Sequence, residues 1–116
     1  MTKYREIVTT ESLAEALESS ERQTVLFFKH SATCGISDRA FNEFQKYLES
    51  PEGSLARNYV IVVQKSREAS NELARLVEVE HESPQAIVVR GGRAIWNDSH
   101  FAIKSEKLAD AVREEN

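Results

Sequence analysis

The sequence contains one cysteine, Cys34, in 116 residues. One cysteine cannot close an internal disulfide, so the chain is neither a disulfide-stabilised secreted scaffold nor a dithiol redox protein. A basic excess is also missing, because 19 acidic residues outnumber 15 Lys and Arg and give a formal net charge of −4. This balance argues against a protein dedicated to nucleic acid or to an anionic membrane surface.

Long apolar runs are absent as well. No segment approaches the roughly 18 consecutive apolar residues of a membrane-spanning helix, and residues 1–18 lack the apolar region of a signal peptide. The apolar fraction of 41% is ordinary for a globular protein. We therefore expect a single cytoplasmic domain over residues 1–116, with a reduced thiol, that is monomeric and binds neither nucleic acid nor membrane.

Hydrophobic periodicity divides the chain into alternating strands and helices. Strands are expected at 4–8, 24–30, 59–63, 85–90 and 93–97. Helices are expected at 9–20, with Ser12 and Glu15 spaced as a capping box, after Cys34 as far as Pro51, from Ser66 to 77, and from Ser105 onward.

The order of these elements is β-α-β-α-β-α-β-β-α. Helices between the early strands imply parallel crossovers, and the Gly91-Gly92 turn implies an antiparallel pair at the end. The expected fold class is therefore α/β, a three-layer α/β/α sandwich around a mixed central sheet. This is the order of the thioredoxin fold.

Cys34 lies directly after a strand of buried type and at the first turn of a helix. Unpaired N–H groups and the helix dipole favour an anion there, and a thiolate is such an anion. Ser37 occupies the position at which a C-x-x-C protein has its second thiol, and we predict that its hydroxyl donates a hydrogen bond to the sulfur. Because a hydroxyl cannot attack a disulfide, an external thiol must release any cap that Cys34 captures. The alternative is a buried cysteine that acts as a small hydrophobic residue.

The Ser83-Pro84 pair allows two interpretations. Proline is tolerated at the start of a strand, where its missing N–H group is not needed. In the functional interpretation the peptide bond is cis and belongs to a loop beside Cys34. The backbone of Ser83 in this loop then pairs with an extended substrate.

Three segments together resemble a known family. "TVLFFKHSATCGIS", "ESPQAIVVRGGRAIW" and "DSHFAIKSEKLADAV" are similar to the YtxJ-like monothiol bacilliredoxins, thioredoxin-fold proteins of bacillithiol-producing Gram-positive bacteria. The resemblance covers essentially the whole chain. It implies that Cys34 is the nucleophile that removes bacillithiol from bacillithiolated client proteins, and that Pro84 is the family's cis-proline. Bacillithiol is then a small-thiol cosubstrate, and no cofactor is expected.

The predicted substrate-binding residues surround this motif and the proline loop. They are Thr33, Gly35, Arg39, Ser83 and Pro84. Family members often carry proline where this chain has Gly35, which loosens the turn without removing the nucleophile.

Bacillithiol carries carboxylates, so the resemblance also implies a basic contact near the thiol. Lys29, Arg39 and Arg90 are the nearest basic residues by element, and Arg39 is preferred because it shares a helix with Cys34. His30 ends the strand before Cys34, where its imidazole either stabilises the thiolate or faces solvent.

Two other functions remain open. "CGIS" resembles the CGFS motif of monothiol glutaredoxins, which bind a [2Fe–2S] cluster between two cysteines and two glutathiones. Those proteins usually have T-V-P where this chain has Glu82-Ser83-Pro84, and a G-G-x-D signature that "NDSHFAI" does not supply. The third possibility is an interaction module whose cysteine has no turnover. The three histidines, His30, His81 and His100, are too widely spaced to predict a zinc site.

Overall fold

The computed structural model describes residues 3–115 and confirms the predicted order of strands and helices. The elements in chain order are β1 (Arg5–Glu6), α1 (Thr10–Ser19), β2 (Val25–His30), α2 (Gly35–Glu49), the 3₁₀ helix η1 (Pro51–Ser54), β3 (Arg57–Val62), α3 (Arg67–Val77), β4 (Gln85–Arg90), β5 (Arg93–Ser99), the 3₁₀ helix η2 (His100–Ala102) and α4 (Ser105–Glu114). Within residues 3–115, no helix combines the length and apolar character needed to cross a membrane.

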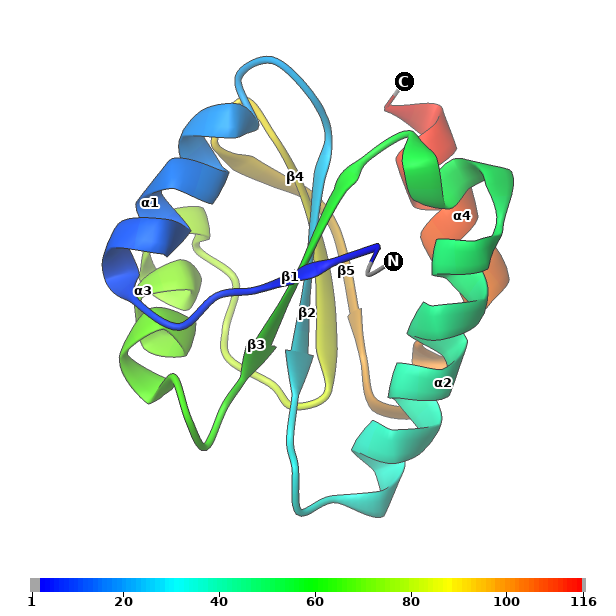
Figure 1. Cartoon of the computed structure of the whole chain (residues 1–116), viewed down its shortest axis with the longest axis horizontal. Helices are drawn as coiled ribbons and strands as arrows, with labels where there is room; N and C mark the ends of the chain where they lie inside the picture. Colours follow the sequence, from blue (N-terminus) through cyan, green and yellow to red (C-terminus); the bar gives the residue numbers. More distant parts are fainter. Residues whose placement is uncertain (1–2, 116) are drawn as a thin grey trace.

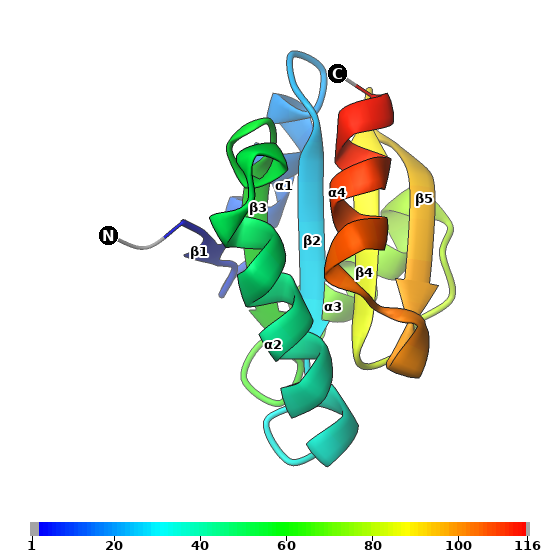
Figure 2. The same cartoon turned by 90° about the vertical axis from the view of Figure 1, so that its right-hand side faces the viewer.

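The five strands form one mixed sheet in the order β1-β3-β2-β4-β5. β1 and β2 each run parallel to β3, whereas β4 is antiparallel to both β2 and β5. Figures 1 and 2 show α1 and α3 on one face of the sheet and α2 and α4 on the other. This is the predicted three-layer α/β/α arrangement, and β2, which leads to Cys34, lies at its centre.

β2 is buried on both faces because its side chains point alternately into two apolar clusters. Leu26 and Phe28 face the cluster beneath α2 and α4, and Val25 and Phe27 face the one beneath α1 and α3. Each of these side chains is fully buried, which stabilises the fold by about 1.5–3 kcal/mol per side chain. The thiol loop therefore begins from a strand anchored in the core on both sides.

Two predicted helix caps are wrong in detail. The capping box of α1 is formed by Thr9 and Ser12, not by Ser12 and Glu15: the Ser12 N–H group donates to Thr9 Oγ1 and the Thr9 N–H group donates to Ser12 Oγ. The helix begins at Thr10, so Ser12 is its third residue, the position from which a side chain reaches back to the cap. Ser66 does precede α3, but its buried hydroxyl makes no capping bond.

The hairpin turn agrees with the sequence. Gly91 and Gly92 have φ values of 63° and 75°, and a type I′ turn requires positive φ at both central residues. β5 continues to Ser99, two residues beyond the expected end, and leads directly into η2.

Candidate functional site

Cys34 is the N-cap residue of α2, at the end of the sheet where β2 terminates. Its φ and ψ of −119° and 124° are extended, and its side chain makes no capping hydrogen bond. The residue is partly exposed and its thiol is free. In Figure 1 this loop forms the lower tip of the molecule. The predicted position of the thiol at a helix N-terminus is therefore confirmed.

The Ser37 side chain bonds to residues at and just after the end of β2. It is fully buried, and its Oγ atom accepts a hydrogen bond from the Ser31 N–H group at 2.8 Å and lies 2.7 Å from His30 Nδ1. Burial lowers the pKa of His30, and the nearby Asp38 opposes only part of this effect. Nδ1 accepts the Ser37 proton in one tautomer of the neutral imidazole and donates to Oγ in the other. Donation from Ser37 to the Cys34 sulfur stays a prediction.

Gln64 was not identified from the sequence, yet it fixes the loop that carries the thiol. It follows β3, and because β2 and β3 are parallel neighbours, the segments beyond their ends meet. Gln64 Oε1 accepts from the Ala32 N–H group at 3.0 Å. Its Nε2 group donates to Ser31 Oγ at 2.8 Å and to Thr33 Oγ1 at 3.4 Å. A lone glutamine in a polar connection carries no sequence signal for this contact, which depends on sheet order.

The Ser83-Pro84 peptide bond is cis, as the resemblance implied. Lys29 of β2 pairs with Gln85 of β4, so Pro84 lies beside His30, at the end of the sheet from which the thiol loop departs. Ser83 Oγ is buried and has no hydrogen-bond partner in the described part of the chain. This hydroxyl therefore does not face a substrate, and any contact from Ser83 must come from its backbone.

Thr33 and Gly35 are both exposed beside Cys34. Apart from its chain neighbours and the backbone of its own helix, no heavy atom of residues 3–115 lies within 4 Å of the position that a Cβ atom would take at Gly35. The fold thus does not require glycine at this point, and the surface next to the sulfur is open to a bulky disulfide partner.

Only one of the three basic residues considered from the sequence remains a candidate for the substrate contact. Lys29 is fully buried; its Nζ atom lies 3.1 Å from His81 Nδ1, and desolvation lowers its pKa to about 8. Arg90 is at the opposite end of the sheet, because β4 is antiparallel to β2. The Arg39 guanidinium lies 5.7 Å from the centre of the Phe101 ring.

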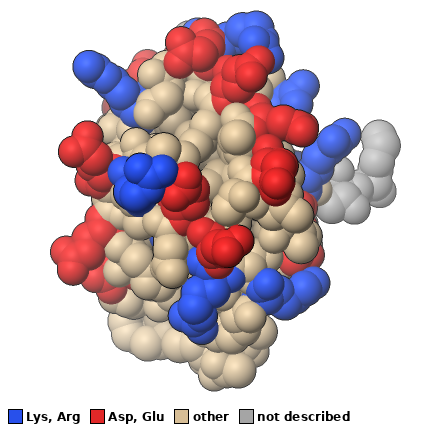
Figure 3. Space-filling model, turned by 90° about the vertical axis from the view of Figure 1, so that its left-hand side faces the viewer, with Lys and Arg blue, Asp and Glu red and all other residues tan. Residues whose placement is uncertain are grey.

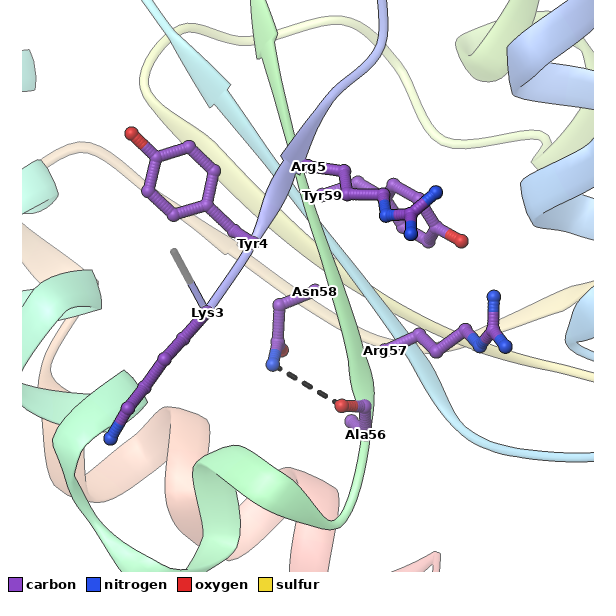
Figure 4. Close-up of a pocket in the computed structure, with 7 residues that line it drawn as sticks. All are labelled: Lys3, Tyr4, Arg5, Ala56, Arg57, Asn58 and Tyr59. Atoms are coloured by element: carbon purple, nitrogen blue, oxygen red, sulfur yellow. Dashed lines mark hydrogen bonds between the residues drawn. The ribbon is translucent and has the colours of Figure 1, made fainter. Parts of the chain in front are cut away.

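A hollow of about 270 Å³ lies away from the thiol, between the chain before β1 and the start of β3. Figure 4 shows Arg5, Arg57 and Tyr59 pointing to one side of β3 and Lys3 and Asn58 to the other. Because β2 and β3 are parallel, the start of β3 is at the far end of the sheet from Cys34. This hollow is not part of the thiol site.

Comparison with known proteins agrees with the site and the fold. The family described as monothiol bacilliredoxin BrxC matches residues 5–108. A solved structure assigned as an oxidoreductase with a thioredoxin fold superposes with a TM-score of 0.81 at 31% identity, over 93% of this chain and 92% of that chain. Thioredoxins of Malassezia sympodialis and Fasciola hepatica superpose with TM-scores of 0.77 and 0.75 at 15% and 13% identity. Each alignment with them covers 97% of this chain, and 90% and 99% of theirs. At that identity the thioredoxins show the fold alone.

Proposed function

Because the chain belongs to the monothiol bacilliredoxin family, a family of thioredoxin-fold thiol oxidoreductases, we propose that it removes bacillithiol from mixed disulfides on client proteins. Cys34 is the attacking and carrying sulfur. The observation that carries this proposal is the placement of a single, partly exposed thiol at the N-cap of α2, beside the cis-proline loop.

The reaction consists of two thiol–disulfide exchanges. The Cys34 thiolate attacks the bacillithiol sulfur of the mixed disulfide, the old S–S bond breaks, and the client cysteine leaves as a thiolate. A free small thiol, as its thiolate, then attacks the bacillithiol sulfur of this new disulfide. Cys34 is released as a thiolate, and a disulfide between the two small thiols is the second product. The electrons come from that external thiol, and no other cofactor takes part.

Ser37 supports an external second step. The residue at the position of a second thiol is a hydroxyl, fully buried and already bonded to Ser31 and directed at His30. An internal group that could displace the cap is therefore lacking at this position. Arg39 remains the residue proposed to contact a carboxylate of the cap, because its guanidinium is exposed on the first turns of α2.

The test is intact-mass spectrometry of the reduced protein after incubation with a bacillithiol-capped protein. A glutathione-capped twin and the Cys34→Ala variant serve as controls. We expect one bacillithiol adduct on Cys34, formed faster than the glutathione adduct and absent from the variant. If neither substrate yields an adduct, the exchange proposal is wrong, and cluster binding or an interaction module without turnover takes its place.

A further inference from the structure

Phe101 is the most exposed large apolar side chain among residues 3–115, with 58% of its surface open to solvent. It lies in η2, the short 3₁₀ helix between β5 and α4. A phenylalanine left in water at a chain turn forgoes most of the burial energy available to it. Because the ring lies at the end of the molecule that carries the thiol, its exposure leaves it accessible to a protein that binds there.

The residue before it, His100, connects η2 to the cis-proline loop. His100 has a φ of 56°, a left-handed conformation that is uncommon for a residue other than glycine. Such conformations persist when the surroundings impose them, and they concentrate at functional sites. Here the His100 N–H group donates to the Pro84 carbonyl at 3.0 Å, and Nε2 lies 3.3 Å from Glu82 Oε1. The cis-proline loop is therefore bonded to the residue that precedes Phe101.

Arg39 connects the same ring to the thiol helix. Its guanidinium lies 5.7 Å from the ring centre, within the distance at which a cation is attracted to an aromatic face. Arg39 follows Cys34 by little more than one turn of α2. Figure 2 shows η2 at the same end of the molecule as the start of α2 and on the same side of the sheet.

The loop that carries the thiol has no charge of its own. Residues 31–37 include no charged side chain, and the nearest charges along α2 are Asp38, in its first turn, and Arg39, whose guanidinium faces the Phe101 ring. Figure 3 shows that the lower tip of the molecule, on the face covered by α1 and α3, is free of charged groups. On the other face, where η2 meets α2, the exposed ring of Phe101 is the apolar group available to a client.

We propose that Phe101 is a specificity-determining residue that contacts an apolar side chain next to the capped cysteine of the client protein. Arg39 acts as a positioning residue, because it holds the ring from the side of α2. This inference rests on the proposed function and adds the class of client to it: segments in which the capped cysteine has apolar neighbours.

The experiment compares two ten-residue peptides, each with a central cysteine capped by bacillithiol and flanked by leucine in one and by serine in the other. We expect the wild-type protein to have a kcat/KM at least about tenfold higher for the leucine peptide, expressed through KM. Phe101→Ala should lower kcat/KM on the leucine peptide to about the value for the serine peptide and so remove this preference, and Phe101→Tyr should restore it. Leu55→Ala is the matched control, since Leu55 is also exposed, at 44%, and follows η1 at the other end of the sheet.

Three results would overturn the inference: a wild-type protein without preference, a Phe101→Ala variant that keeps both its rate and its preference, or a variant whose rate falls by the same factor on both peptides. The third result would mean that the ring contacts the cap or orients the thiol.

Failure of every peptide to react would instead refute the proposed function. In that case, peptide binding is measured by fluorescence with Cys34→Ser, alone and combined with Phe101→Ala. Tighter binding of the leucine peptide that depends on Phe101 supports the inference, and equal binding of the two peptides rejects it.

Discussion

Among single residues, Ser37 has the most enclosed polar group of the thiol site. Its hydroxyl satisfies the N–H group of Ser31, which is itself buried, and pairs with His30. Ser37→Ala leaves both partners without this bond, so we expect the free energy of unfolding to fall by about 1–3 kcal/mol. Urea unfolding followed by circular dichroism measures the change.

Ser54→Ala is the control for this prediction. The Ser54 hydroxyl also bonds to a backbone group, the Pro51 carbonyl, but the residue is exposed, so water replaces the lost bond and the change should stay within about 0.5 kcal/mol. Equal stability of the two variants would show that the buried Ser37 hydroxyl does not hold the first turn of α2 to β2.

Among the elements, α2 has a start that is suited to proline. Gly35 is its first residue, the position at which proline is favoured, and the space around it is open. Cys34 already has the extended φ and ψ, −119° and 124°, that a following proline demands. We expect Gly35→Pro to raise the free energy of unfolding by about 0.4–1 kcal/mol, because the unfolded chain loses freedom.

Gly53→Ala is the contrasting variant for the same urea measurement. A Cβ atom at Gly53 would approach the Leu48 carbonyl oxygen to 2.5 Å, so η1 has to shift and the protein should lose stability. A loss of stability in Gly35→Pro comparable to that of Gly53→Ala would contradict the geometry described for the start of α2.

The thiol loop is the element whose order depends on a side chain far away in sequence. Removal of the Gln64 amide in Gln64→Ala should speed hydrogen exchange of the Ala32 N–H group, which Gln64 Oε1 now protects. Gln64→Glu keeps an acceptor but loses both donated bonds, so it should preserve most of that protection. Amide exchange followed by NMR tests both variants.

The control is Gln45→Ala, because Gln45 is an exposed glutamine on the outer side of α2, and this variant should behave as the wild type. Unchanged exchange of the Ala32 N–H group in Gln64→Ala would refute the contact.

At the scale of the whole molecule, the buried Lys29 makes stability depend on pH. Its pKa is lowered from 10.5 to about 8 by desolvation, so between these values the unfolded chain binds more protons than the folded one. Lys29 therefore lowers the free energy of unfolding most below pH 8, and this destabilisation becomes smaller as the pH rises through the window. Lys29→Met removes the buried charge, and His81, which is exposed, can bond to water instead.

We expect Lys29→Met to be more stable than the wild type by about 1–3 kcal/mol at pH 7, with a smaller advantage at pH 9.5. Urea unfolding at both pH values measures the difference, and Lys46→Met on the surface of α2 is the control. An advantage that does not shrink with pH would mean that the pKa of Lys29 is not lowered in the folded protein.

Two histidines make stability depend on pH in the acidic range. The pKa values of His30 and His81 are both lowered, in His30 by burial and in His81 by partial desolvation of the ring and by the charges of Lys29 and Arg67, so the unfolded chain takes up their protons first as the pH falls below about 6.5. Stability is therefore lost with falling pH in this range, above the range in which most carboxylates titrate.

The sequence alone determined the architecture and identified the candidate for the reactive atom. Alternation of period along the chain predicts each strand and helix, because residues 25–28 and 86–89 are continuous apolar runs and the helices between them repeat at helical spacing. The tight Gly91-Gly92 turn predicts the final antiparallel pair. The single cysteine and the hydroxyl three residues later predict a thiol that cannot release its own cap. These features are local, so short stretches of sequence are sufficient to identify them.

Only the tertiary structure decided which groups surround that thiol. The parallel pairing of β2 with β3 brings Gln64 to the thiol loop, and the reversal of direction in β4 takes Arg90 to the far end of the sheet. The pleat of β2 turns Lys29 into the core beneath α3 while its neighbour His30 faces Ser37. Contacts between residues distant in the chain depend on strand order, register and the face to which each side chain points, and none of these is encoded in the residues next to Cys34.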